Sequence, residues 1–207
     1  MELCRICFRP LDEGLSLKEY LFGKDLICGN CRHKFIRNHR VYEYKQLRVH
    51  AFYHYDDFME RLLFQYKNGD IALHNIFLYQ VKEKVNDIFR HHSCVIMPSN
   101  EEKIKERSYH HLKEMLADCN VLIEECFIKN KVHKQSLQRA KNREKVKDVI
   151  ELVRKPKNKY YLFDDVITTG NTLLACANLL REKDEIIEAY VLSVHPHFVE
   201  LCDKEKL

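Results

Sequence analysis

The chain has 207 residues, of which 45% are apolar, and its formal net charge is +4. This length suits one domain of ordinary size with a small appendage, and the apolar share is enough for a packed core, which excludes wholesale disorder. No stretch reaches the ~20 apolar residues of a membrane span, and the N-terminus lacks the basic-then-apolar pattern of a signal peptide. We therefore expect a cytoplasmic protein whose clustered cysteines bind a metal rather than form disulfides.

Two Cys-x-x-Cys pairs mark the first forty residues. They are Cys4 with Cys7 and Cys28 with Cys31, separated by 20 residues. Each pair can present two thiolates to one ion, and four sulfurs complete the tetrahedral shell of Zn²⁺. Since a closed shell leaves no open position, we expect a structural zinc that replaces a core this unit cannot build. Gly29 and Asn30 are residues that tolerate the positive φ that a tight thiolate-bearing turn often needs.

The other five cysteines share no such spacing and are expected to be plain, at least partly buried thiols. They are Cys94, Cys119, Cys126, Cys176 and Cys202.

From Arg32 to Tyr55, basic, histidine and aromatic residues alternate. This surface could stack unpaired bases, or it could simply pack against another part of the chain. Apolar residues at helical spacing then predict helices over about 58–66 and 77–88, separated by the turn-forming Asn68-Gly69-Asp70. Residues 41–92 are therefore expected to form a helical connecting region.

From residue 93 onward, short apolar runs alternate with longer amphipathic stretches. The runs predict buried strands at 94–97, 121–123, 160–163 and 189–194. The stretches between them predict helices near 101–118, 134–153 and 172–183. Such alternation is typical of a parallel sheet covered by helices. The predicted fold class is α/β, with a parallel sheet and flanking helices, preceded by a small four-cysteine zinc finger.

The positive charge is concentrated in one segment. Residues 129–159 carry 12 lysine or arginine side chains against 3 acidic ones. They could form one long solvated helix, or they could bind a polyanion such as DNA or a diphosphate. In the second interpretation the nucleic-acid candidates are Arg139, Lys141, Arg143 and Lys145.

The passage from Tyr160 to Thr172 carries the clearest chemistry. A predicted strand ends in two adjacent carboxylates, Asp164 and Asp165, at the edge where parallel sheets bind ligands. The turn that follows contains Thr168, Thr169, Gly170, Asn171 and Thr172. It opens onto a helix whose N-terminal N–H groups favour phosphate, and its hydroxyls add donors. Carboxylates would repel a phosphate but could accept hydrogen bonds from ribose hydroxyls.

Two other interpretations of this passage stay open. The turn could do no more than cap the helix. A strand followed by two acids also occurs in P-loop NTPases, but those proteins need a G-x-x-x-x-G-K-[ST] loop. The only Gly-Lys pair here, in Gly23-Lys24-Asp25, lacks that context.

Residues 163–172 resemble the 5-phosphoribosyl-1-diphosphate (PRPP) signature of type I phosphoribosyltransferases. Together with the N-terminal finger, the chain resembles the ComF family, whose ComFC-type members are competence proteins of natural transformation. Further matches are Phe52-x-x-Tyr55, Lys67-Asn68-Gly69, Met97-Pro98, Arg107 and, more loosely, Gln135 with the 139–143 stretch.

The resemblance implies a site for PRPP with Mg²⁺. Asp164 and Asp165 would contact the ribose 2′- and 3′-hydroxyls. The 5′-phosphate would be held by Thr168, Thr169, Gly170, Asn171 and Thr172. Arg107 would meet the diphosphate, together with the charges of Lys103 and Lys105.

The chain departs from the family pattern at two places. After Arg107 the family usually has Gly-Phe-Asn, and this chain has Ser108-Tyr109-His110. The 6-oxopurine salvage enzymes carry a further Asp that assists at the base, where this chain has Thr168. A purine-salvage role therefore lacks one candidate for general acid–base catalysis.

The expected organisation is a zinc finger over 1–40, the connecting region over 41–92 and a phosphoribosyltransferase-like domain over 93–207. Three functions remain in view. The first is a PRPP-binding protein that acts in DNA uptake during transformation, through single-stranded DNA or other competence proteins. The second is an active phosphoribosyltransferase with an unidentified acceptor. The third is an interaction module whose phosphoribosyl site is vestigial.

Overall fold

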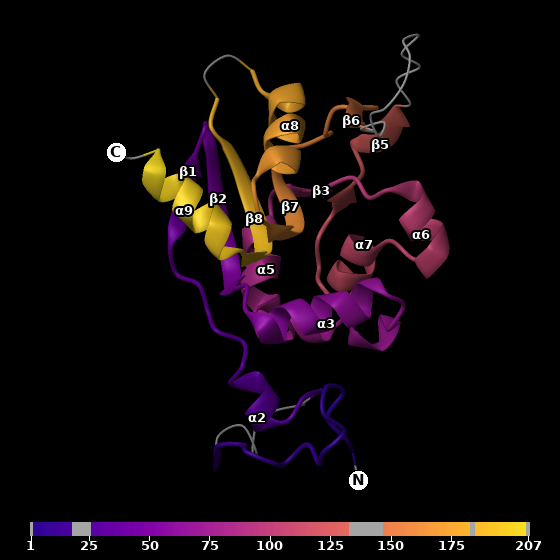
Figure 1. The fold of residues 1–207 in the computed structure, drawn as a ribbon, viewed down its shortest axis with the longest axis vertical. Coiled ribbons are helices and arrows are strands. Elements are labelled where there is room, and N and C mark those ends of the chain that lie inside the picture. The colour runs from indigo at the N-terminus through magenta and orange to yellow at the C-terminus, as the bar shows by residue number, and fades with distance from the viewer. Residues whose placement is uncertain (1, 18–25, 133–146, 183–184, 206–207) are drawn as a thin grey trace, which may run out of the picture.

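A six-stranded sheet forms the centre of the protein in a computed structural model, which describes residues 2–17, 26–132, 147–182 and 185–205 (Figure 1). In spatial order the strands are β1 (Val41–Tyr44), β2 (Leu47–His54), β8 (Ile187–Val194), β7 (Tyr160–Ile167), β3 (Ser93–Ile96) and β4 (Ile123–Glu124). The strands from β2 to β4 all pair in parallel, and only β1 is antiparallel to its neighbour. The predicted α/β class with a mostly parallel sheet is confirmed.

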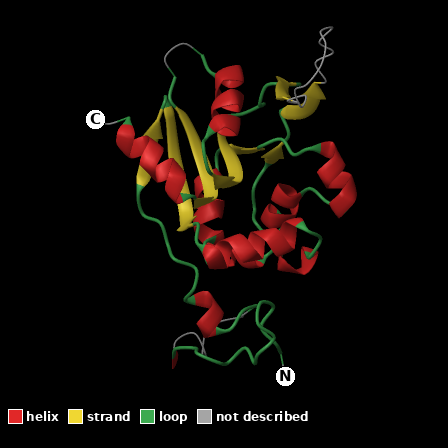
Figure 2. Cartoon of the chain, in the orientation of Figure 1, coloured by secondary structure: helices red, strands yellow, loops and turns green. Residues whose placement is uncertain are grey.

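Helices cover both faces of this sheet (Figure 2). On one face, α5 (Lys82–Phe89) places the ring of Phe89 against Tyr161 and Tyr190. On the other, α9 (Pro196–Lys204) places Phe198 against the two tyrosines of β1. The helix α8 (Asn171–Leu180) follows β7 and begins beside α9, because Gly170 lies against Phe198. The core is therefore built from aromatic and branched residues on both sides of the central strands.

The carboxyl ends of the parallel strands lead into the helices that surround the candidate site. Strand β2 leads into α3 (Asp57–Lys67), which begins where the Asp56 side chain accepts a hydrogen bond from the Met59 N–H at 2.8 Å. Strand β3 leads into α6 (Glu101–Arg107) and α7 (His111–Leu116). Two short helices, η1 (Ile71–Leu73) and α4 (Ile76–Tyr79), lie between α3 and α5. Figure 1 shows α3, α6 and α7 grouped at this edge.

Residues 41–44 and 47–54 are strands, although the sequence predicted a helical connecting region over 41–92. The alternation of charged and aromatic residues has a period of two, so Tyr42 and Tyr44 are buried while Val41 and Glu43 face outward. The helical prediction holds only from Asp57 onward. How the chain divides into separately folding units stays a prediction.

The same strands decide between the two interpretations of the aromatic stretch. Phe35, Tyr42, Tyr44, Phe52 and Tyr53 are all buried. Because their ring faces are covered by neighbouring side chains, this stretch is a packing surface rather than a platform for unpaired bases.

The described parts of the basic segment are two paired strands and a loop, and not one long helix. Strand β5 (Phe127–Val132) pairs with β6 (Lys147–Leu152) in antiparallel register, with Phe127 opposite Leu152. The helix predicted over 134–153 is therefore wrong at residues 147–152. Its remainder, with Gln135 and the four nucleic-acid candidates Arg139, Lys141, Arg143 and Lys145, lies outside the described residues.

The helix predicted over 101–118 is also divided. Ser108 adopts a left-handed backbone, with φ of 65°, and ends α6 before α7 begins. Across the described ranges, no helix is long and apolar enough to cross a membrane.

Candidate functional site

The four cysteines of the two Cys-x-x-Cys pairs come together in one cluster. The sulfur atoms of Cys4, Cys7, Cys28 and Cys31 all lie within 4.8 Å of one another, and Cys7 Sγ is 3.6 Å from Cys28 Sγ. Four sulfurs at ~2.3 Å from a zinc ion at the corners of a tetrahedron are about 3.8 Å apart. The cluster therefore fits a structural Zn²⁺, as the spacing predicts.

Gly29 serves this cluster in a different way from the one expected. It begins the short helix α2 (Gly29–Arg32) with an ordinary backbone, and its N–H donates to the Glu13 carbonyl at 2.9 Å. A Cβ at Gly29 would lie 1.8 Å from the Gly14 carbonyl oxygen. Glycine is needed at position 29 because the backbone of Gly14 approaches it so closely. The positive φ belongs to Gly14, at 75°.

The remaining five cysteines are thiols outside this cluster, as predicted. Cys94, Cys126, Cys176 and Cys202 are buried and Cys119 is half-buried. Burial raises the pKa of the Cys119 thiol to about 11, which makes it a poor nucleophile at neutral pH.

A cavity of about 680 Å³, here called the carboxyl-edge cleft, lies where β3 and β7 end and α3, α6 and α7 surround them. Its charged lining residues are Lys67, Lys103, Glu106, Arg107, Lys129, Asp164 and Asp165. Cations and carboxylates thus face the same space. A ligand that carries both hydroxyl groups and negative charge would satisfy this combination.

Asp165 is the best-anchored carboxylate of the cleft. Its Oδ2 forms an ion pair with Lys67 Nζ and lies 3.4 Å from His111 Nε2, while its Oδ1 accepts from the Val166 N–H at 2.8 Å. Burial alone would raise the pKa of Asp165, but Lys67 and His111 outweigh it and hold this pKa well below its usual range. Asp165 is therefore ionised at neutral pH.

Asp164 behaves in the opposite way. Burial, reinforced by the adjacent charge of Asp165, raises the pKa of Asp164 well above its ordinary value. Its Oδ1 accepts a hydrogen bond from the Asp165 N–H at 2.9 Å. Asp164 and Asp165 therefore carry one negative charge readily, on Asp165, whereas ionising Asp164 as well is unfavourable.

The turn after β7 places a helix N-terminus beside these carboxylates. Gly170 has a left-handed backbone, with φ of 74°, and precedes the ten-residue helix α8. A Cβ here would lie 3.0 Å from the ring of Phe198, so both the backbone and the space favour glycine. Thr172 lines the cleft together with the two carboxylates. Thr168 and Asn171 are exposed at the turn and do not line the cleft. The Asn171 N–H donates to Thr169 Oγ1 at 3.5 Å.

The residues after Arg107 differ from the family pattern, but defined contacts hold this turn in place. Ser108 adopts the left-handed conformation that glycine would take without strain. Tyr109 is buried, and its hydroxyl donates a hydrogen bond to the Tyr66 carbonyl. Arg107 Nε donates to the Lys103 carbonyl at 2.9 Å, and the side chain lines the cleft.

Most of the residues that line the cleft were not among the site residues predicted from the sequence, and Lys67, Ser99 and His111 matter most among them. Lys67 appears there only inside the Lys67-Asn68-Gly69 match, and Ser99 and His111 carry no local signal. Lys67 and His111 reach Asp165, and Ser99 reaches His111, because the end of α3, the start of α7 and the chain after β3 meet beside β7. A local sequence pattern does not reveal this arrangement.

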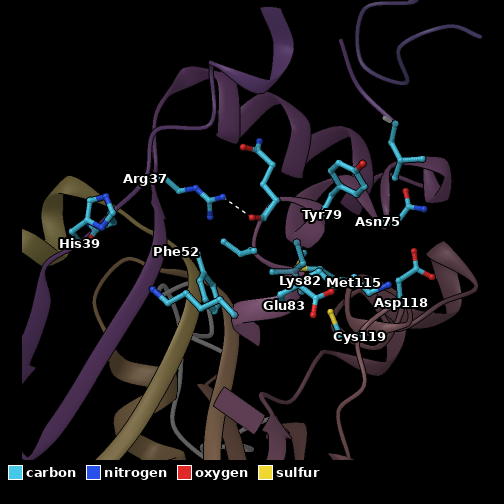
Figure 3. Close-up of a pocket in the computed structure, with 16 residues that line it drawn as sticks. Arg37, His39, Phe52, Asn75, Tyr79, Lys82, Glu83, Met115, Asp118 and Cys119 are labelled. Atoms are coloured by element: carbon cyan, nitrogen blue, oxygen red, sulfur yellow. Dashed lines mark hydrogen bonds between the residues drawn. The ribbon is translucent and has the colours of Figure 1, made fainter. Parts of the chain in front are cut away.

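A larger cavity, of about 930 Å³, lies elsewhere and is shown in Figure 3. It lies between the chain that leaves the finger, with Arg37 and His39, and a group formed by Tyr79 of α4, Glu83 of α5 and Asp118 in the turn after α7. Arg37 is already engaged there, since its guanidinium donates to the Gln80 carbonyl at 2.7 Å. The cavity shares no lining residue with the carboxyl-edge cleft, which is where the carboxylates and the helix N-terminus are, so we place the candidate site at the cleft.

Comparison with known proteins gives a limited picture. No family model matches the sequence, and no curated protein matches it. Among solved structures, a hypoxanthine phosphoribosyltransferase from Staphylococcus aureus is similar over 58% of this chain, with 12% identity and a TM-score of 0.33. The matched part spans 62% of the length of that protein.

Proposed function

We propose that the chain binds PRPP, as its Mg²⁺ complex, in the carboxyl-edge cleft. The observation that carries this proposal is the convergence of the buried Asp165, the half-buried Asp164, the N-terminus of α8 and several cations on one space near the ends of parallel strands. The resemblance of residues 163–172 to the PRPP signature supports the same assignment.

Each part of the ligand has a matching group. The ionised Asp165 and the adjacent Asp164 would accept hydrogen bonds from the ribose hydroxyls, with Asp164 free to donate while it is protonated. The N–H groups that begin α8, with the hydroxyls of Thr168, Thr169 and Thr172, would hold the 5′-phosphate. Lys67, Lys103 and Arg107 would face the diphosphate, whose charge Mg²⁺ partly neutralises when it is bound.

Calorimetric titration of the full chain with PRPP and Mg²⁺ tests this proposal. We expect Asp165→Asn to weaken binding by about tenfold or more, because a charge-assisted hydrogen bond contributes roughly 1.5–3 kcal/mol. Asp118→Asn, which removes an equal charge from the larger cavity, should bind as the unmodified protein does. Binding that is absent, or equally strong in both variants, would refute the assignment.

A second candidate is a true phosphoribosyl transfer at the same site. It is favoured by the cations that face the expected diphosphate, because they would stabilise pyrophosphate as it leaves. A nucleophile would form a bond to C1 of the ribose as the bond from C1 to the diphosphate oxygen breaks. Pyrophosphate release with a panel of bases and amines would reveal this activity. Its absence while PRPP still binds would favour a ligand-regulated role.

We also propose, from the resemblance of the finger and the PRPP signature together, that the protein acts in the cytoplasm in DNA uptake. Single-stranded DNA and other competence proteins would be its partners. Neutral substitutions at Arg139, Lys141, Arg143 and Lys145 should weaken DNA binding and reduce its dependence on salt. Unchanged affinity and salt dependence would count against DNA contact by this segment.

A further inference from the structure

His111 is a buried histidine that has a partner at each ring nitrogen. Its Nε2 lies 3.4 Å from Asp165 Oδ2, and its Nδ1 lies 3.2 Å from Ser99 Oγ. The residue is only 7% exposed, and it lines the carboxyl-edge cleft together with both partners. A carboxylate, an imidazole and a hydroxyl are therefore connected in series along one wall of the cleft.

The chemistry of the three groups sets which of them can donate a proton to which neighbour. The ionised Asp165 can only accept, so Nε2 of His111 must carry the proton that faces it. With Nε2 as the donor, Nδ1 is the ring nitrogen left to accept, and the Ser99 hydroxyl is the donor within reach of it. Ser99 thereby fixes which nitrogen of His111 is protonated, and His111 in turn holds Asp165.

The backbone of His111 is fixed from a different direction. Its carbonyl accepts a hydrogen bond from the Tyr66 hydroxyl at 2.7 Å, and Tyr66 is fully buried in α3. The ring also stacks on His110, with ring centroids 5.6 Å apart and planes 15° apart. Main chain and ring are thus held by separate contacts, so the imidazole has little freedom to leave Asp165.

Lys67 is the movable partner of the same carboxylate oxygen. Its side chain is 37% exposed, whereas the side chain of His111 is 9% exposed. Lys67 also lines the cleft, so a phosphorylated ligand would attract its ammonium group away from Asp165. Asp165 would then keep only His111 as a side-chain partner on Oδ2.

We propose that His111, with its tautomer set by Ser99, is the positioning residue that holds Asp165 for a ribose hydroxyl while Lys67 turns to the phosphate. This inference rests on the proposed binding of a ribose phosphate in the cleft. It adds a residue that acts through Asp165 and does not itself touch the ligand.

Two probes separate this role from a general loss of structure. Ribose 5-phosphate offers both hydroxyls and phosphate, whereas inorganic pyrophosphate offers charge without hydroxyls. His111→Leu, which cannot donate, should weaken ribose 5-phosphate binding by about tenfold while pyrophosphate affinity stays within about twofold. His111→Gln retains a donor and should restore most of the loss. In an Asp165→Asn background, His111→Leu should change ribose 5-phosphate affinity by less than about twofold, because the carboxylate it positions is gone.

Equal losses for both probes, or an undiminished loss in the Asp165→Asn background, would overturn the inference. A measurement on the unliganded protein covers the case in which His111→Leu fails to fold. Nitrogen-15 NMR of the imidazole should show a protonated Nε2 and an unprotonated Nδ1, and Ser99→Ala should shift the Nδ1 resonance. The opposite tautomer would refute the role of His111. Failure of the unmodified protein to bind either probe, with the expected tautomer present, would instead refute the proposed function.

Discussion

Replacing Asp164 by Asn should stabilise the protein at neutral pH. Burial and the neighbouring charge of Asp165 raise the pKa of Asp164 well above 3.8, whereas in the unfolded chain the carboxyl ionises near ~3.9. Between these two pKa values the folded state holds a proton that the unfolded state has lost. The free energy of unfolding therefore falls as the pH rises through this window, by up to about 1.4 kcal/mol per pH unit from this group alone.

Asparagine removes this dependence and keeps the local geometry. Its side-chain oxygen can still accept from the Asp165 N–H, which lies 2.9 Å from Asp164 Oδ1. Urea unfolding at about pH 5, 6 and 7, without ligand, should show that the advantage of Asp164→Asn grows with pH. A variant that is less stable than the unmodified protein at pH 7, or that has the same pH dependence, would refute the reasoning.

Asp165→Asn is the matched control, one residue along the same strand. Burial would raise the pKa of Asp165, but Lys67 and His111 lower it overall, so its stabilising effect is present above the unfolded pKa. That effect is lost only as the pH falls through the lower, folded pKa. We expect Asp165→Asn to lower the free energy of unfolding by about 1–3 kcal/mol at each of the three pH values. This is less than for a fully buried ion pair, because the side chain of the partner Lys67 is 37% exposed. The two adjacent substitutions should thus have opposite signs.

Three further predictions concern the finger and the turn before α8. Elemental analysis should find one zinc ion per chain. Cys28→Ser should lose this zinc, whereas the control Cys176→Ser, in the core of the sheet domain, should keep it. A Cys28→Ser protein with full zinc content would contradict a zinc site at the four-cysteine cluster. Gly29→Ala should also lose zinc, because its Cβ would lie 1.8 Å from the Gly14 carbonyl oxygen, and normal zinc content would show that the loop is not held there. Gly170→Ala should lower the melting temperature by roughly 2–8 °C, because a left-handed backbone costs alanine about 1–2 kcal/mol. Gly170→Asn should lower the melting temperature less, since asparagine tolerates this backbone better. Equal effects would indicate that contact with Phe198, and not φ, causes the loss of stability.

Sequence patterns were most informative where one local feature determines one structural element. The apolar runs at 94–97 and 160–163 are indeed central strands, and the paired cysteines do converge. Strands β1 and β2 escaped prediction because their buried residues alternate with polar ones, such as Glu43 in β1 and Arg48 and His50 in β2, which resembles a binding surface. The β5–β6 hairpin escaped because its pairing, such as Phe127 with Leu152, joins segments on either side of a long charged stretch.

The candidate site divides in the same way. Asp164, Asp165 and Gly170 stand in one continuous passage, and their types and order predict a carboxylate edge followed by a helix N-terminus. Lys67 and His111 come from other helices and meet Asp165 only after the sheet has assembled. Their effect on Asp165 depends on burial and on the two side chains sharing its Oδ2 atom. Residue spacing along the chain does not predict such a contact.

The most direct test of the account is to map where PRPP with Mg²⁺ binds on the full chain by backbone amide NMR. We predict that the largest shift changes fall on Lys67, Arg107 and residues 164–172, around the carboxyl-edge cleft. Changes centred instead on Arg37, Tyr79 and Asp118, which line the larger cavity, would contradict it, as would no change at a ligand excess that saturates a specific site.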